Sequence, residues 1–127
     1  MADHNEVGSW GEDYAAEYLQ RHGYAILERD WRYGRSKRDI DIICKTEDGA
    51  MVVFVEVKTR SHEEVTDPEN AVNIKKIRHI GQAADHYVKM NNIVEDLRFD
   101  IIAITGRKGT DNIKLNHIVD AFNPLLV

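Results

Sequence analysis

The fold is decided by two neighbouring stretches of sequence, Asp39-Ile40-Asp41-Ile42-Ile43-Cys44 and Met51-Val52-Val53-Phe54-Val55-Glu56-Val57-Lys58-Thr59-Arg60. Both are rich in β-branched and aromatic residues, which predicts two strands. Asp48-Gly49 between them is typical of a hairpin turn. If the turn centres on this dipeptide, Asp41 pairs with Glu56. Directly opposed residues project to the same side of a sheet, with Cβ atoms about 4.5–5.5 Å apart.

The hairpin therefore predicts a cluster of charges in a very apolar setting. Lys58 lies two residues beyond Glu56, so it projects from the same strand face. Two carboxylates as close as Asp41 and Glu56 repel each other unless a cation lies between them. An Asp, a Glu and a Lys on one face form a candidate divalent-metal site for phosphodiester cleavage. The alternative is a simple Glu56–Lys58 ion pair near an exposed strand end, and these residues alone leave it open.

Length and composition predict one domain, spanning residues 1–127, with a substantial hydrophobic core. No apolar run approaches the roughly 20 residues that span a bilayer. The first six residues are polar and acidic, so we expect no signal peptide. Cys44 is the only cysteine, which excludes an internal disulfide and fits a reducing compartment. We expect a cytoplasmic protein that does not associate with membranes.

The net charge of −5 argues against nucleic-acid binding, but the charges are unevenly distributed. Residues 29–38 hold five cations and one carboxylate, with Trp31 and Tyr33 interleaved among them. A local basic patch can attract phosphates even on an acidic protein. The alternative is an arginine-rich loop that is merely solvated.

The rest of the chain predicts an α/β fold in which helices flank a mixed sheet. Ser9 is a plausible cap for a first helix that ends at Gly23, with Glu12 three residues on as in a capping box. Glu12 could equally reach a site at the sheet edge. A second helix is predicted for residues 73–90. Strands are predicted for residues 24–29, 39–44, 51–59, 97–105 and 113–119.

Other chemistries lack their signatures. The six histidines show no metal-ligand spacing, and a single cysteine excludes a zinc ribbon. The sequence contains neither a Walker loop nor a Gly-rich dinucleotide fingerprint.

One ordered set of motifs runs through most of the chain: Gly8-x-x-Gly11-Glu12-x-x-Ala15, Tyr18-Leu19, Gly23-Tyr24, Ile40-Asp41, Phe54-Val55-Glu56-Val57-Lys58-Thr59-Arg60 and Arg98-Phe99-Asp100. This set resembles the bacterial family UPF0102 (YraN-like). That family looks like a member of the restriction-endonuclease-like, PD-(D/E)xK superfamily. Archaeal Holliday junction resolvases are its nearest analogues in pattern. One departure is Arg38-Asp39-Ile40-Asp41, where the family usually carries Gly-Glu-Ile-Asp.

The resemblance implies a restriction-endonuclease-like fold and an active site made of Glu12, Asp41, Glu56 and Lys58. Asp41, Glu56 and the Val57 carbonyl would hold Mg²⁺ or Mn²⁺, and Lys58 would orient water or stabilise the transition state.

We expect the nucleic acid to be DNA. Four cations would contact its phosphates and position it without reading its sequence. These cations are Arg35, Lys37, Arg38 and Arg60.

Two functions follow from these expectations. The first is a metal-dependent endonuclease that selects branched or junction DNA, which would suggest a two-fold homodimer because two strands must be cut symmetrically. The alternative is a non-catalytic nucleic-acid-binding or scaffold module that retains the nuclease fold.

Overall fold

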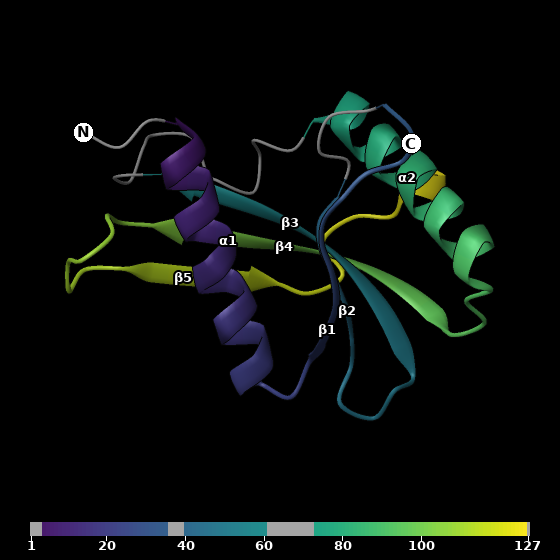
Figure 1. Cartoon of the computed structure of the whole chain (residues 1–127), viewed down its shortest axis with the longest axis horizontal. Helices are drawn as coiled ribbons and strands as arrows, with labels where there is room; N and C mark the ends of the chain where they lie inside the picture. Colours follow the sequence, from purple (N-terminus) through teal and green to yellow (C-terminus); the bar gives the residue numbers. More distant parts are fainter. Residues whose placement is uncertain (1–3, 36–39, 61–72, 127) are drawn as a thin grey trace.

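The computed structural model describes residues 4–35, 40–60 and 73–126, and within them a mixed sheet with a helix on each face (Figure 1). The elements in chain order are α1 (His4–Arg21), β1 (Ala25–Trp31), β2 (Ile40–Lys45), β3 (Met51–Arg60), α2 (Ile74–Asn91), β4 (Asp96–Thr105), β5 (Lys114–Ile118) and the 3₁₀ helix η2 (Pro124–Leu126). The strand order is β1-β2-β3-β4-β5. Only the β3–β4 pair is parallel among these strands. The predicted α/β fold is confirmed.

The β2–β3 hairpin has the predicted register. Ile42 pairs with Val55 and Lys45 with Val52, so the turn centres on Asp48-Gly49. Gly49 adopts φ 74°, a left-handed conformation that glycine takes without steric cost. The Asp48 carboxylate accepts hydrogen bonds from the Thr46 hydroxyl at 2.7 Å and the Ala50 N–H at 3.0 Å. Local turn chemistry therefore sets the pairing that brings Asp41 toward Glu56.

The two faces of the sheet carry separate cores. On one face Ala15, Ala16 and Leu19 of α1 pack against alternate residues of the central strands, among them Ile42 and Val55. On the other face Ala83, Ala84 and Tyr87 of α2 pack against the intervening residues, among them Ile43 and Phe54. The strands are thus covered on both sides, as the continuous apolar run of β3 requires.

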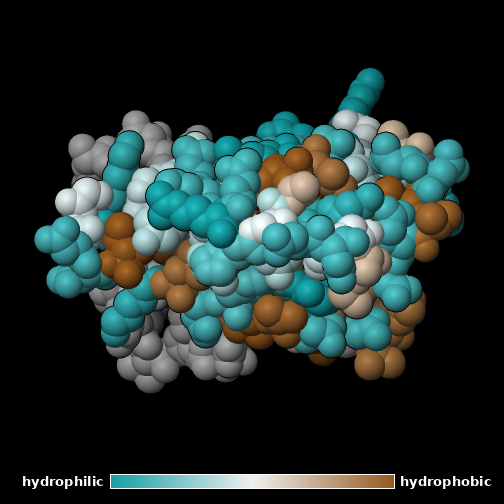
Figure 2. Space-filling model, turned by 90° about the horizontal axis from the view of Figure 1, so that it is seen from below, coloured by the Kyte–Doolittle hydropathy of each residue, from teal (hydrophilic) through white to brown (hydrophobic). Residues whose placement is uncertain are grey.

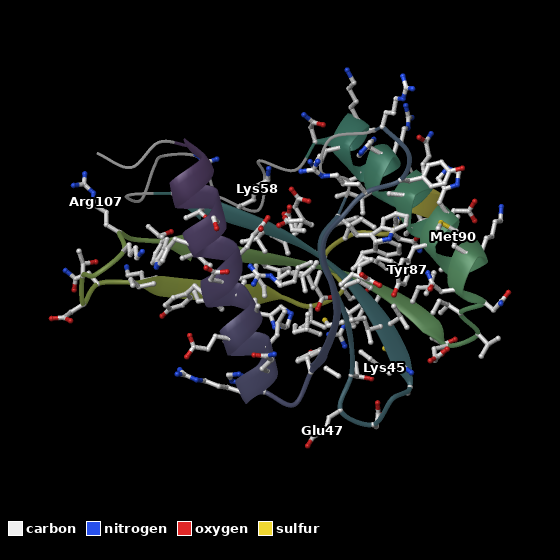
Figure 3. The ribbon with its side chains drawn as sticks, in the orientation of Figure 1. Lys45, Glu47, Lys58, Tyr87, Met90 and Arg107 are labelled. Carbon is white, nitrogen blue, oxygen red and sulfur yellow. The ribbon has the colours of Figure 1, made fainter. Side chains whose placement is uncertain are left out.

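The helix α2 begins where the sequence predicts. The Asn73 side chain accepts a hydrogen bond from the Lys76 N–H at 2.9 Å and caps the first turn. Tyr87 points from α2 toward the sheet (Figure 3) and is 4% exposed. Its ring meets Trp31 edge-on, with centroids 5.3 Å apart.

The predicted start of the first helix is wrong. α1 begins at His4, so Ser9 lies inside the helix and does not cap it. Glu12 is consequently in the third turn and is not part of a capping box. A capping role for Glu12 is therefore excluded, because the N–H groups that need a cap lie in the first turn of a helix.

The face of the molecule that Figure 2 shows is mainly hydrophilic. Figure 2 shows one face, on which hydrophobic side chains form separate patches between polar ones. No helix in the described part of the chain combines the length and apolar character needed to cross a membrane.

Candidate metal centre and active site

Asp41 lies where β2 and β3 stop pairing. The last backbone pair of this ladder is Ile42 with Val55. Beyond it, Asp41 Oδ2 accepts a hydrogen bond from the Val57 N–H at 2.8 Å. A side-chain carboxylate thus takes the position of a backbone acceptor and holds the strands together at the point where they separate. Asp41 is only 7% exposed.

Asp30 on β1 reaches the same level of the sheet through an irregular strand. A register shift between Ile26 and Glu28 inserts one extra residue into β1. After the shift, Arg29 pairs with Ile42 and Trp31 with Ile40. Asp30 therefore lies opposite Asp41, and without the extra residue the pairing of every later residue would change.

The chain also turns at Asp30, which adopts φ 51°. Arg29 donates a hydrogen bond at 2.6 Å to Asp13 of α1, whereas Trp31 packs against Tyr87 of α2. Residues two apart in a regular strand share one face, so this change of face marks a local twist. Asp30 lies at the twist, and Asp and Asn are the residues after glycine that best tolerate positive φ.

Glu12 approaches from α1 and completes a group of three carboxylates. One carboxylate oxygen from each of Glu12, Asp30 and Asp41 lies within 4.8 Å of the others. Glu12 is 3% exposed. The preceding Gly11 allows this approach, because a Cβ added there would meet Thr59 Oγ1 at 2.0 Å. A donor set of three carboxylates fits a hard divalent cation such as Mg²⁺, Mn²⁺ or Ca²⁺.

Glu56 lies beside this group, between a carboxylate and two ammonium groups. Its Oε1 atom is 3.6 Å from Lys58 Nζ and 3.7 Å from Lys76 Nζ. Burial and the Asp41 charge raise the pKa of Glu56 to about 7, although Lys76 and Lys58 lower it. Such a strongly perturbed carboxylate is characteristic of functional sites.

The structure brings the predicted catalytic residues together in two adjoining sets. Glu12 and Asp41 share the three-carboxylate group, and Glu56 and Lys58 share the ion pair next to it. Glu56 lies outside the group whose oxygens are mutually within 4.8 Å, so the predicted ligand set of Asp41, Glu56 and Val57 differs from the set that the structure gathers. Lys58 lies toward the end of β3 away from the hairpin turn that Glu47 marks (Figure 3).

The structure describes two of the four cations that were predicted to contact phosphates. Arg35 is exposed and follows β1, and Arg60 is the last residue of β3. Lys37 and Arg38 lie outside the described residues.

Sequence reasoning missed Asp30 and Lys76 as members of the site. No sequence motif marks Asp30 as a site residue, because its position beside Asp41 depends on the extra residue in β1. Lys76 did carry a signal, because cations in the first turns of a helix oppose its dipole. Its contact with Glu56 now gives that charge a partner.

Comparison with known proteins places the chain in a family. The model of "Uncharacterised protein family UPF0102" matches residues 11–104. A UPF0102 protein of Bacteroides thetaiotaomicron is 44% identical over 126 residues, covering 99% of each chain. One of Flavobacterium psychrophilum is 42% identical over 122 residues, covering 96% of this chain and 98% of the relative.

One solved structure overlaps this one loosely. Pyrococcus furiosus SfsA, determined in complex with Ca²⁺, gives a TM-score of 0.36 at 15% identity, covering 87% of this chain and 61% of SfsA. The sequence matches are far closer and span nearly the whole chain, and by them this protein belongs to the UPF0102 family.

Proposed function

We propose that this protein is a metal-dependent endonuclease that cleaves DNA, with a preference for branched or junction substrates. One observation carries the proposal: the carboxylates of Glu12, Asp30 and Asp41 converge within 4.8 Å beside the Glu56–Lys58 pair. Anionic groups repel at such distances, and a bound divalent cation would offset that repulsion. The comparisons name no activity, and the proposal rests on the chemistry of the site.

The metal centre would be held by Glu12, Asp30 and Asp41, with Glu56 and the Val57 carbonyl available on its β3 side. Bound Mg²⁺ or Mn²⁺ would polarise a scissile phosphate and acidify a water molecule. The protein's own groups then position the reactants. Asp41 is fixed by the Val57 N–H, and Lys58 would orient the attacking water or stabilise negative charge developing on the phosphate.

Glu56 has a pKa of about 7, which suits a group that exchanges a proton near neutral pH. In the proposed reaction it would accept the proton from the attacking water. Lys76 would balance its charge and keep the side chain in place, 3.7 Å from Oε1.

The phosphate backbone would be held by Arg35, Lys37, Arg38 and Arg60. Such contacts would make binding sequence-independent and strongly dependent on salt. Cleaving both strands of a junction symmetrically would require a homodimer. The buried Cys44, whose pKa burial raises to about 12, would remain a thiol in a reducing cytoplasm.

The decisive experiment is cleavage of branched, single-stranded and duplex DNA with Mg²⁺ or Mn²⁺. We expect Lys58→Ala to abolish cleavage while DNA binding survives, because it removes transition-state stabilisation and leaves every carboxylate in place. Asp30→Asn and Asp41→Asn should reduce cleavage by lowering metal affinity, and excess Mn²⁺ should partly restore it.

The matched control is Lys45→Ala, which removes a lysine at the other end of the hairpin, where it pairs with Glu95 at 2.7 Å. It should cleave at the wild-type rate. If DNA is bound but no substrate is cut above the level of an Asp41→Asn/Lys58→Ala variant, the enzyme is excluded. A non-catalytic DNA-binding module that keeps the fold would then be the function.

A further inference from the structure

We infer that Tyr33 and His86 form a stacking platform for an unpaired base. This inference deepens the proposed function: it assigns the substrate class as DNA containing single-stranded nucleotides. The platform joins the segment after β1 to α2, two parts of the chain that are distant in sequence.

The geometry of the pair is that of a stack. The ring centroids of Tyr33 and His86 are 3.8 Å apart, and the planes are nearly parallel at 5°. The two aromatic pairs that Tyr87 of α2 makes in the core, with Trp31 and with Phe54, are perpendicular at 85°. Two flat rings held face to face leave their outer faces parallel, which is the shape on which another ring can stack.

The Tyr33 side of the platform is partly open to solvent, and His86 is half-buried. Tyr33 is 44% exposed, whereas Tyr87 on the same helix side of the sheet is 4% exposed. A stack that served only to fasten the segment to α2 would gain most by burying both rings. Exposed cations adjoin it in the sequence, since Arg32 and Arg35 flank Tyr33. Aromatic faces with neighbouring arginines are the usual means of binding single strands without reading their sequence.

Two elements lead directly from the metal centre to the platform. β1 carries Asp30 three residues before Tyr33. α2 carries Lys76, which contacts Glu56, and ten residues later His86. At about 1.5 Å per residue this separation is about 15 Å along the helix. A strand whose phosphate lies at the carboxylates could therefore place a base a few nucleotides away on Tyr33.

Only an unpaired base can use such a surface. Bases inside a duplex stack on one another, and placing one on a protein ring requires taking it out of the helix. Single strands, flaps and junctions already offer unstacked bases. The pair therefore favours substrates with single-stranded nucleotides over continuous duplex.

The test measures binding in EDTA, where no cleavage occurs, using a labelled single-stranded 20-mer and the matching duplex. Tyr33→Leu should bind the single strand about tenfold more weakly, in the range expected for the loss of one stacked base. Duplex affinity should stay within twofold. Tyr33→Phe and Tyr33→Trp should bind like wild type because both keep an aromatic face. A 2-aminopurine base should lose fluorescence on binding to wild type and recover it with Tyr33→Leu.

The control for charge is Arg107→Ala, since Arg107 lies at the opposite end of the molecule from α2 (Figure 3). It should leave single-strand affinity unchanged. Equal binding of the single strand by wild type and Tyr33→Leu, or no binding by wild type, would overturn the platform. Failure of cleavage in the separate metal assay would remove the proposed enzyme without affecting this result. An RNA strand of the same sequence tests whether the platform requires DNA.

Discussion

Burial, repulsion and attraction have opposing effects on the pKa of Glu56. Burial and Asp41 raise its pKa, Lys76 and Lys58 lower it, and the result is about 7. In an unfolded chain a glutamate ionises near pH 4.3. Between these two values the folded protein holds a proton that the unfolded chain has lost. The free energy of unfolding therefore falls as pH rises through this window.

Glu56→Gln should remove this pH dependence. In EDTA, wild type should lose on the order of 2–3 kcal/mol of unfolding free energy between pH 5 and pH 8, at about 1.36 kcal/mol per pKa unit. The Gln variant should lose distinctly less and be the more stable protein at pH 8. Urea denaturation at several pH values measures the difference. Glu47→Gln, at an exposed glutamate of the hairpin turn, should follow wild type. Parallel curves for wild type and Glu56→Gln would contradict the shifted pKa.

Among the elements, α1 and β3 make an unusually close contact. Gly11 lies against Thr59, and a methyl group at Gly11 would also meet Thr59 Cβ at 3.2 Å and Cγ2 at 3.3 Å. Glu12 follows immediately, so the spacing between helix and strand fixes how far its carboxylate reaches. The contact therefore couples helix–strand packing to the geometry of the three-carboxylate group.

Gly11→Ala should push α1 away from the sheet and weaken metal binding. The overpacked contact should cost about 1–3 kcal/mol of stability, although alanine is otherwise the better helix former by about 1 kcal/mol. Thr59→Ala removes Oγ1 and Cγ2 and leaves only Cβ close to the added methyl group, so the double variant should recover most of the stability and of the metal affinity. Thermal melting with and without Mn²⁺ gives both quantities. Additive effects of the two changes would show that the contact does not couple helix to site.

The elements also show which features a sequence can predict. The hairpin was predictable because Asp48-Gly49 encodes its turn locally, and it brought Asp41 toward Glu56. β1 was predicted to end near Arg29, but it continues to Trp31 through an extra residue and a left-handed Asp30. Those irregularities place Arg29 against α1 and Trp31 against α2. Asp30 therefore could not be recognised from its neighbours in sequence.

At the scale of the molecule, the three-carboxylate group connects both layers of the fold. Glu12 comes from the helix layer, and Asp30 and Asp41 come from two strands of the sheet. In the absence of a cation, repulsion among the three carboxylates lowers the stability of the fold. A bound cation would attract all three and so raise that stability. Stability of the whole chain should therefore depend on divalent metal.

Asp30→Asn should separate the repulsion among the carboxylates from the stabilisation by a bound cation. Asparagine tolerates positive φ, so the substitution removes charge while keeping the backbone. Without metal the variant should melt at or above the wild-type temperature. With Mg²⁺ or Mn²⁺ at one hundred times Kd, wild type should gain about 2.7 kcal/mol and the variant much less. Asp111→Asn, at an exposed aspartate between β4 and β5, should respond like wild type. An equal metal response in wild type and Asp30→Asn would remove Asp30 from the ligand set.

The irregular path of β1 has a consequence for how copies of this protein meet. β1 forms one edge of the described sheet, and a straight edge exposes backbone groups that can recruit a strand from another molecule. The extra residue and the left-handed turn at Asp30 interrupt that row of donors and acceptors. A variant with a regular β1, lacking the extra residue, would lose the carboxylate geometry. Its edge would also expose backbone groups that can pair with a strand of another molecule. Such a variant should therefore both aggregate and bind divalent metal less tightly, because both effects follow from the changed path of β1.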